Sequence, residues 1–351
     1  MKGQIRIRDY GVCIGKLEPG RLNSITDVQG VQVGHFTLKD KDINTGVTAI
    51  LPHTGNLFYN KVTAASYVIN GFGKTLGTVQ LEELGTIETP IILTNTLSVG
   101  TAHQALVEFM LKNNEDIGDT TGTVNPIVCE CNDGYLNDIR GLNIKEEHIF
   151  KALEAASEEF LEGAVGAGTG MVCYGLKGGI GTASRLVRLD KDTYTLGALV
   201  MSNFGRKDDL LIDGFKAGQF IYQLEKDKEL NSDKGSVIII LATDIPMTNR
   251  QLKRVCKRTA AGLSRTGTHF GNGSGDIVIG FTTANNIRHY EENDFVDIKV
   301  LNENRIDAVF RAAAECTEEA VLNSLICADT TKGRMNRIKY SLKEYINEII
   351  L

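Results

Sequence analysis

Five short apolar runs, spread along 351 residues, constrain the fold more than any other feature of the sequence. They are rich in β-branched residues, most are bounded by Gly, Pro or Asn, and they cover residues 46–51, 89–94, 195–201, 236–243 and 277–283. Several are apolar at consecutive positions, as strands are when both of their faces are covered. They therefore predict strands within a layered fold, and we expect 277–283 to be a central strand with Ser274 at its open end.

Helical patterns lie between and after these runs. Residues 144–162 form one pattern, with Asn143 as a candidate N-cap and Glu146 three residues later, as in a capping box. Three further helices are expected over 249–264, 307–328 (with or without a break) and 335–350. Strands mixed with helices place the chain in the α/β or α+β class. Since no repeat, low-complexity tract or linker interrupts the sequence, we expect a single domain over residues 1–351.

Charge and cysteine content argue against several classes of protein. The net charge is −6, from 38 basic and 44 acidic residues, whereas a nucleic-acid-binding protein usually carries a basic face. Cys129 and Cys131 have no second pair at zinc-site spacing, so buried free thiols are favoured over a metal site. The N-terminus carries charges where a signal peptide is apolar, and no apolar run approaches the roughly 20 residues of a membrane span. We expect a soluble, cytoplasmic protein without nucleic-acid or membrane partners.

Glycine is the residue type in clear excess, with 37 glycines against five prolines. Several lie in two segments, 163–170 and 177–185, whose backbone N–H groups are of the kind that cradles phosphate. Neither segment matches G-x-x-x-x-G-K-[ST], and the first follows a predicted helix where a dinucleotide motif follows a strand. A non-catalytic nucleotide-binding protein is thus an alternative, but tight packing of loops is the favoured interpretation.

A third glycine-rich segment, 269–276, leads directly into the last apolar run and holds a serine between two glycines. Gly273 has no Cβ, so the Ser274 hydroxyl can approach the Gly273 carbonyl, which suits an N→O acyl shift followed by hydrolysis. Cleavage between Gly273 and Ser274 leaves an α-amine, with a reference pKa of about 8, on the same residue as the hydroxyl. Such an amine is a general base for its own nucleophile, so no histidine is required.

Two other interpretations of this segment stay open on the residues alone. Turn glycines with a capping serine explain G-x-G-S-G-D about as well as a self-cleavage site does. A Ser-His-Asp triad is the competing enzymatic interpretation, but the sequence lacks the G-x-S-x-G nucleophile elbow. The six histidines are scattered, and His35, His53 and His103 have no obvious partner.

Eight segments, in their order along the chain, carry a resemblance to a known family: 23–35, 46–52, 94–100, 132–138, 163–170, 177–185, 203–205 and 271–276. Together they resemble the L-aminopeptidase/D-amidase-D-esterase family, which includes the β-peptidyl aminopeptidases. The resemblance implies a four-layer αββα domain of the self-cleaving N-terminal-nucleophile hydrolases, cut into an α chain of residues 1–273 and a β chain of residues 274–351. It also implies homotetramers of the cleaved pair, and catalysis without a metal or organic cofactor.

An aminopeptidase is the activity that this resemblance implies. Enzymes of the family act on the free N-terminus of short peptides, amides or esters, and members differ in their preference for small L-, D- or β-amino acids. Relatives that turn the same machinery on another amide, such as pantetheine, or that transfer the acyl group to an amine are the alternatives among enzymes. The self-cleaving ornithine acetyltransferases use a threonine nucleophile, which is absent at position 274.

The resemblance also assigns site residues one by one. Ser274 is the expected nucleophile, and Asn203 donates its side-chain amide to the oxyanion. Tyr135 lies beside Asn203, and Glu130 holds the ammonium group of the substrate. On the residues alone, Asn203 before Phe-Gly also fits a turn, and Glu130 also fits a surface charge.

A hydroxyl residue two positions before a glutamate completes the implied site, and Thr317 with Glu319 fits this pattern, although serine is the family's usual hydroxyl residue there. Residues two apart on a continuous helix do not face each other. Both can serve the site only if a helix starts near Thr317, with Thr317 as its N-cap and Glu319 in its first turn. Solvated charges on an ordinary amphipathic helix are the alternative.

Overall fold

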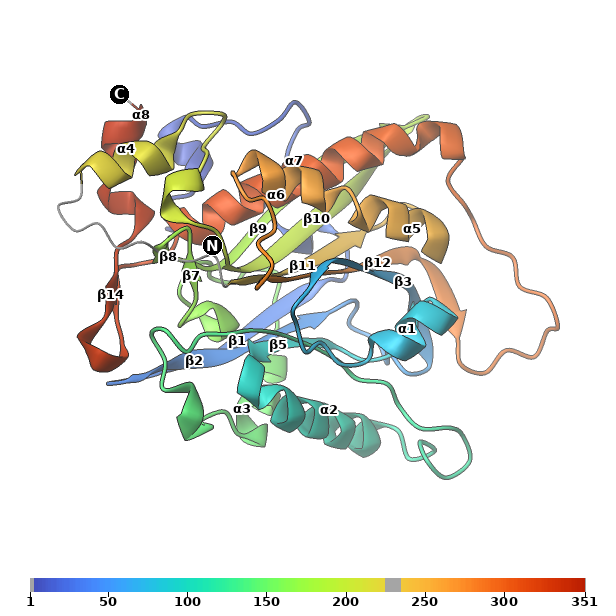
Figure 1. The fold of residues 1–351 in the computed structure, drawn as a ribbon. Coiled ribbons are helices and arrows are strands. Elements are labelled where there is room, and N and C mark those ends of the chain that lie inside the picture. Colours follow the sequence, from blue (N-terminus) through green and yellow to red (C-terminus); the bar gives the residue numbers. More distant parts are fainter. Residues whose placement is uncertain (1–2, 225–234, 351) are drawn as a thin grey trace.

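Two stacked β-sheets form the centre of the computed structural model, which describes residues 3–224 and 235–350 (Figure 1). One sheet has four strands, in the order β1 (Gln32–Asp40), β2 (Ile43–Leu51), β5 (Ile91–Asn95) and β6 (Ile127–Cys131). The other has six, in the order β4 (Thr86–Ile87), β3 (Asn60–Gly71), β12 (Gly275–Arg288), β11 (Ser236–Thr243), β10 (Asp192–Asn203) and β9 (Gly179–Leu189). Two strand pairs lie outside these sheets: β7 (Val172–Cys173) with β8 (Leu176–Lys177), and β13 (Thr331–Lys332) with β14 (Ile338–Lys339).

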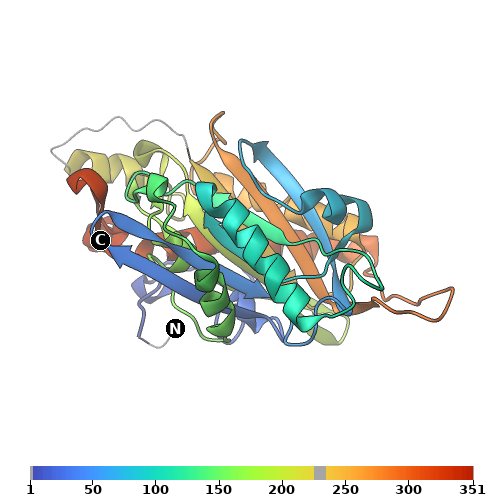
Figure 2. The same cartoon turned by 90° about the horizontal axis from the view of Figure 1, so that it is seen from below.

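Helices cover the outer face of each sheet and complete four layers. The four-stranded sheet is covered by α2 (Val99–Asn113) and α3 (Glu146–Glu154), which cross it in the view from below (Figure 2). The six-stranded sheet is covered by α5 (Asn249–Cys256), α6 (Thr259–Arg265) and α7 (Ile306–Ile326) (Figure 1). The other α-helices of the described residues are α1 (Thr78–Leu84), α4 (Ala217–Leu224) and α8 (Ile346–Ile350). The αββα arrangement expected from the sequence is confirmed.

Apolar cores fill the spaces between these layers. The core between the two sheets includes Leu93 of β5 and Ile279 of β12. A second core joins the six-stranded sheet to its helices and includes Val278 of β12 and Val321 of α7. Because side chains alternate along a strand, β12 presents Ile279 to the other sheet and Val278 to the helices. Both faces of β12 are therefore covered, as its consecutive apolar residues predict.

β12 lies inside the six-stranded sheet and not at its edge. It pairs in parallel with β11, where Ser236 lies opposite Gly275, and antiparallel with β3 on its other side. The pairing with β3 shifts register between Asp276 and Ile277, a β-bulge of the kind that often lies beside active sites. The prediction of a central strand over 277–283 with Ser274 at its open end is thus confirmed, and the strand extends from Gly275 to Arg288.

Two of the predicted helices have different ends. α3 takes Lys145 and not Asn143 as its N-cap, and it ends at Glu154. It stops there because the chain next pairs with β1: Ser157 and Val33 exchange backbone hydrogen bonds of 3.0 and 3.1 Å. The segment 249–264 forms two helices, α5 and α6, because the chain turns after Cys256.

The last two helix predictions have opposite outcomes. α7 runs unbroken from Ile306 to Ile326. The prediction of a helix over 335–350 is wrong, because β14 and a 3-10 turn at Leu342–Glu344 precede the short α8. The expected apolar stripe does not form: Ile338 is 42% exposed in β14, whereas Leu342 and Ile346 are buried.

The glycines of 163–170 and 177–185 allow backbones to approach each other closely. A Cβ on Gly46 of β2 would lie 2.3 Å from the Gly166 oxygen, and a Cβ on Gly179 would lie 2.0 Å from the Gly163 oxygen. No side chain larger than hydrogen fits at such distances. These contacts confirm tight packing as the role of the two segments.

Within residues 3–224 and 235–350, no helix has both the length and the apolar character that a membrane crossing demands.

Candidate active site

Ser274 lies immediately ahead of β12, in a tight turn that starts at Gly271. Its backbone N–H donates to the Gly271 carbonyl oxygen at 2.9 Å, and the residue is only 2% exposed. Its Oγ donates a hydrogen bond of 2.6 Å to Oδ1 of Asp276. The sequence analysis assigned no role to Asp276, although the signal was present, because residues two apart on a strand share a face.

The end of β3 fixes the turn from the other side. The side-chain amide of Asn70 donates to the Gly271 oxygen at 3.2 Å and also to the Ser274 oxygen. The backbone N–H of Phe72 donates to the same Ser274 oxygen at 3.2 Å. No local pattern marks Asn70 as a site residue, because some two hundred residues separate it from Ser274.

β10 ends at Asn203, at the same end of the six-stranded sheet as Ser274. Asn203 lies opposite Ser236 of β11, and Ser236 lies opposite Gly275 of β12. One strand therefore separates Asn203 from the residue after Ser274, so their backbones are about 10 Å apart, or two strand spacings. Two of the predicted site residues, Ser274 and Asn203, thus lie at the same end of the six-stranded sheet.

The amide of Asn203 is held at both ends. Its Oδ1 accepts from the backbone N–H of Val172 at 2.9 Å, and its Nδ2 donates to the carbonyl oxygen of Asn132 at 3.1 Å. A side-chain amide nitrogen has two hydrogens, so one remains for a further acceptor. The turn interpretation of Asn203 is wrong, because the residue is paired within β10.

Asn203 and Asp276 lie on opposite faces of the sheet in the uncut chain. Met201 belongs to the core between the sheets, so by alternation Asn203 points to that side as well. Val278 belongs to the core under the helices, so Asp276 points to that side. The hydroxyl of Ser274, bonded to Asp276, is consequently turned away from the Asn203 amide.

Glu130 of β6 places a buried carboxylate close to β12. Its Oε1 accepts from the backbone N–H of Lys74 at 2.9 Å, and Thr96 donates to Oε2. A Cβ on Gly73 would lie 3.7 Å from Glu130 Oε1 and 3.8 Å from the Cα of Gly275. Gly73 thus lies between the carboxylate and the residue after Ser274. The surface-charge interpretation of Glu130 is wrong, because the residue is 3% exposed.

Tyr135 lies in the loop that follows β6, three residues after Asn132, whose carbonyl oxygen accepts from Asn203. Its ring is within 4.8 Å of the Arg337 guanidinium and 4.6 Å of Lys339 Nζ, measured from the ring centroid. Arg337 also donates to the Tyr135 carbonyl oxygen at 3.2 Å. The C-terminal strand β14 therefore helps to hold the loop that carries Tyr135.

Lys177 is a buried lysine that holds the chain segment bonded to the Asn203 amide. The sequence analysis treated it only as part of a glycine-rich segment. Lys177 Nζ donates to the carbonyl oxygens of Met171 (2.8 Å), Gly168 (3.0 Å) and Gly178 (2.6 Å). Burial lowers the pKa of Lys177 to about 7. Met171 directly precedes the residue that donates to Asn203, so Lys177 fixes one side of the amide.

A buried aspartate lies on the other side of the same amide. Burial raises the pKa of Asp133 to about 7, while the Asn137 side chain, which donates to Oδ1 at 2.9 Å, and the charge of Lys177 act in the opposite direction. Asp133 directly follows Asn132, whose carbonyl accepts from Asn203. Two buried titratable groups, Lys177 and Asp133, are thus connected to the two partners of the Asn203 amide.

Thr317 does not start a helix, so the expectation that it is an N-cap is wrong. α7 begins at Ile306, and Thr317 Oγ1 donates to the carbonyl oxygen of Ala313 at 2.8 Å, one turn earlier in the same helix. The run of alanines before Thr317 favours a continuous helix at this point. Glu319 consequently lies in the middle of α7 and not in its first turn.

Glu319 belongs to a buried ion network at a distance from Ser274. Its carboxylate accepts from Arg8 and from Arg185, both at 2.6 Å, and these arginines hold its pKa below the usual range despite burial. Arg185 lies six residues along β9 from Gly179, which is about 20 Å in a strand. Since Gly179 marks the Asn203 end of the sheet, the structure does not bring Glu319 to Ser274. The solvated-charge alternative is also wrong, because Glu319 is fully buried.

The two neighbouring cysteines are buried in β6 as thiols. Burial raises the pKa of Cys129 to about 12 and holds that of Cys131 well above its usual value. Across the described ranges, no three His, Cys, Asp or Glu side chains are grouped so that they could hold a metal ion.

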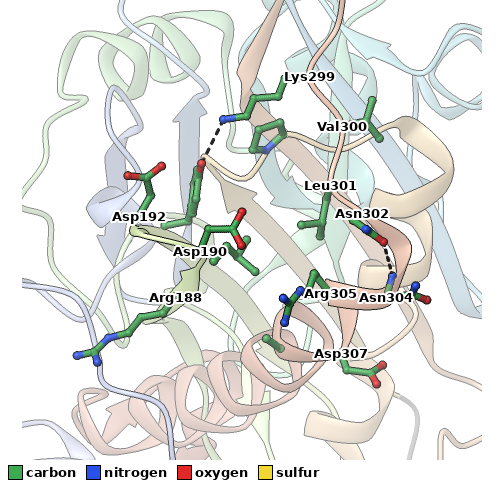
Figure 3. A pocket seen from close by; sticks show the side chains of 14 residues that line it. Arg188, Asp190, Asp192, Lys299, Val300, Leu301, Asn302, Asn304, Arg305 and Asp307 are labelled. Carbon is green, nitrogen blue, oxygen red and sulfur yellow. Dashed lines mark hydrogen bonds between the residues drawn. The ribbon is translucent and has the colours of Figure 1, made fainter.

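A pocket of about 470 Å³ lies at the other end of β9 and β10, near the turn that joins these strands (Figure 3). Its lining combines Arg188, Lys299 and Arg305 with Asp190 and Asp192. Asn203 and Gly179 lie at the opposite ends of the same two strands. The pocket is therefore separate from the sheet edge that carries Ser274.

An αββα sandwich whose central strand begins directly after a buried serine has the architecture of an N-terminal-nucleophile hydrolase. The fold of this chain closely matches a solved structure of that class, described below. The model of peptidase family S58 matches residues 23–339, and the chain belongs to this family.

Known relatives match the chain over nearly its whole length. The β-peptidyl aminopeptidase BapA of Sphingosinicella microcystinivorans is 39% identical over 350 residues, covering 93% of this chain and 87% of the relative. The structure of the PH0078 protein from Pyrococcus horikoshii OT3 is 52% identical, with a TM-score of 0.93 and 98% of both chains covered. That of the L-aminopeptidase D-Ala-esterase/amidase from Ochrobactrum anthropi, a prototype of the serine aminopeptidases with a variant Ntn hydrolase fold, is 37% identical, with a TM-score of 0.91 and 99% and 98% covered.

These matches identify the chain as a serine aminopeptidase. They do not favour the pantetheine-type hydrolase, the acyltransferase or the non-catalytic nucleotide-binding protein that the sequence analysis kept as alternatives.

Proposed function

We propose that the chain cuts itself between Gly273 and Ser274, and that the α chain (1–273) and the β chain (274–351) together form the peptidase. The observation that carries this proposal is the position of Ser274, buried at the head of a central strand within a tight turn. The glycine before it leaves its carbonyl open to attack by a neighbouring hydroxyl. Membership of the S58 family supports the same mechanism.

Peptide hydrolysis then uses the residue that the cut has freed. Ser274 is no longer tied to the turn and rotates its Oγ toward the face that carries Asn203. The hydroxyl attacks the substrate carbonyl, the α-amine of Ser274 takes its proton, and the remaining N–H of Asn203 Nδ2 donates to the oxyanion. One such donor contributes about 3 kcal/mol to stabilisation of the transition state in acyl-transfer enzymes. We assign Tyr135, which follows Asn132 in the same loop, to the same position, and water releases the acyl-enzyme.

Recognition of a free N-terminus is the role that we assign to Glu130. Gly73 lies between its carboxylate and Gly275, the residue after the proposed nucleophile. A buried carboxylate pairs strongly with an ammonium group, which a peptide carries only at its N-terminus or on a lysine. The substrates are therefore short peptides, amides or esters with a free amine, and the names of the relatives point to β-amino acids as well as small L- or D-residues. Thr317 and Glu319 have no part in this site.

Self-cleavage is tested by intact-mass spectrometry of the purified protein. We expect two chains, the smaller one beginning at Ser274, and aminopeptidase activity on short β-peptides and amino-acid amides. Ser274→Ala should give one uncut chain without activity, whereas Asn203→Ala should be cut but lose about a hundredfold in kcat. An uncut wild-type chain with full activity would contradict the proposal.

A further inference from the structure

A long loop between β12 and α7 projects from the body of the molecule (Figure 1). We call residues 289–301 of this loop the arm. Every residue from 290 to 300 is exposed, and residues 295–302 form neither a helix nor a strand. Phe295 is 91% exposed, which is unusual for so large an apolar side chain. Three further apolar side chains of the arm are also exposed: Val296, Ile298 and Val300.

Both ends of the arm are fixed to the body of the molecule. The His289 N–H donates to the Tyr59 carbonyl oxygen at 2.9 Å, and the Leu301 N–H donates to the Pro246 carbonyl oxygen at 2.8 Å. In contrast, no described residue forms a hydrogen bond or an ion pair with residues 294–298, the tip of the arm. An exposed apolar surface on a fixed support is typical of a binding site, since little freedom is lost when it binds.

The pocket of Figure 3 lies at the base of the same arm. Its lining includes Lys299, Val300 and Leu301, which belong to the arm. Its volume of about 470 Å³ leaves room for an aromatic side chain. Part of its wall is apolar, made by Leu189, Tyr194, Pro246, Leu301 and Ala308. An exposed aromatic side chain and a pocket that could receive one therefore lie at opposite ends of the arm.

α5 borders the base of the arm with a basic face. Gln251 Nε2 of α5 donates to the Leu301 carbonyl oxygen at 2.7 Å. Among the described residues, this face has two acidic ion-pair partners, Glu82 and Glu303. The basic side chains of α5 and the two residues after it outnumber them: Arg250, Lys253, Arg254, Lys257 and Arg258.

The arm carries the opposite charge. Its acidic residues are Glu291, Glu292, Asp294 and Asp297. An acidic arm and a basic helix on one chain are complementary to each other, and such complementarity favours a particular partner and orientation. Because the tip of the arm projects from its own chain, this attraction is available to a second copy of the chain.

We propose that the arm binds a second copy of this chain, with Phe295 in the pocket of that copy and the acidic residues of the arm against its α5. An interface between two identical copies closes when each contributes the same self-complementary surface. Here the arm and the surface that receives it are contiguous. Two arms that lie antiparallel across a two-fold axis, each reaching about 20 Å over some six residues, place each tip beside the base of the other arm. This inference goes beyond the proposed function and does not depend on where the chain is cut.

Native mass spectrometry of an arm variant tests the proposal. In Phe295→Asp a charge replaces the aromatic anchor, and each pair of copies loses two anchors. Association should weaken at least about a hundredfold, and the mass of the assembly at micromolar concentration should fall to half that of the wild type or less. The matched control is Val79→Asp, since Val79 is 86% exposed on α1 and belongs neither to the arm nor to the pocket. This control should keep the wild-type mass, and both variants should keep the wild-type far-UV circular dichroism spectrum.

A mixing experiment separates binding of the arm in the pocket from a general loss of apolar surface. Asn304→Trp fills the pocket from an exposed position and should also separate the copies. A mixture of Phe295→Asp and Asn304→Trp should form mixed pairs, because the arm of the second variant still fits the pocket of the first. Phe295→Asp with the wild-type mass, or a mixture without mixed pairs, would overturn the proposal. A wild-type protein with one copy of the chain at micromolar concentration would also overturn it, and would assign the arm to a different protein partner.

Discussion

On the proposed function, Ser274 changes its proton acceptor when the peptide bond before it is cut. In the uncut chain its hydroxyl hydrogen is bonded to Asp276, and after the cut its own α-amine lies within reach of the hydroxyl. Such an amine accepts a proton only when it is neutral. Its reference pKa is about 8, so at neutral pH the environment decides how much of the enzyme is active.

The pH dependence of peptide hydrolysis should therefore have a simple acidic limb. Desolvation lowers the pKa of the amine, whereas the nearby Asp276 carboxylate favours the ammonium form and raises it. Because these effects oppose each other, we expect kcat/KM to fall with decreasing pH through a single titration between roughly pH 6 and 8.5. Initial rates on a neutral amide substrate check this profile. A limb that disappears when any one histidine is replaced would point to a Ser-His-Asp enzyme.

Local sequence patterns predict some residues of the candidate site and miss others that are held in place by contacts with distant segments. Ser274 was visible because its glycine neighbours mark a permissive backbone before a strand. Asn203, Glu130 and Tyr135 were assigned by resemblance alone. Asn70 and Lys177 act through contacts with chain segments that the sequence does not bring together, so no local pattern could reveal them.

At the scale of elements, hydrophobic periodicity predicted the strands well and the helix ends poorly. The run 236–243 coincides with β11, because a strand covered on both faces must be apolar throughout. Helix ends depend on tertiary contacts: α3 stops where Ser157 pairs with β1, and the C-terminal pattern is replaced by β14. The prediction that Thr317 is an N-cap was wrong because α7 starts at Ile306, well before the Thr317-Glu-Glu319 motif.

Glu319 provides a test at the level of α7. In Glu319→Gln the carboxylate that faces Arg8 and Arg185 is lost, and breaking a buried ion pair costs about 3–5 kcal/mol of folding free energy. We expect a clear loss of thermal stability with an unchanged acidic limb of the pH profile. Differential scanning calorimetry and the pH profile measure the two effects. The control is Glu303→Gln, whose pairs with Arg250 and Arg254 are exposed, so stability should change little.

The opposite result would indicate that Glu319 belongs to the active site. A downward shift of the acidic limb in Glu319→Gln, with stability unchanged, would mean that the carboxylate acts on the Ser274 amine.

At the scale of the whole molecule, the ion network joins the two chains that the proposed cut creates. Arg8 and Arg185 belong to the α chain, and Glu315 and Glu319 to the β chain. The chains should therefore stay together after cleavage. We propose that four cleaved pairs assemble into a homotetramer, and native mass spectrometry should give one species with four copies of each chain. A cleaved pair that stays alone at micromolar concentration would contradict this assembly.

The position of β12 between β11 and β3 also determines how the mature protein can be lost. While the chain is continuous, β12 enters the sheet as part of one folding reaction. If the chain is cut before Ser274, as proposed, a β chain that has dissociated must reinsert β12 between β11 and β3 in order to refold. Refolding of the separated chains should then be inefficient. We therefore expect the unfolding rate of the cleaved enzyme, and not an equilibrium between folded and unfolded states, to govern its lifetime.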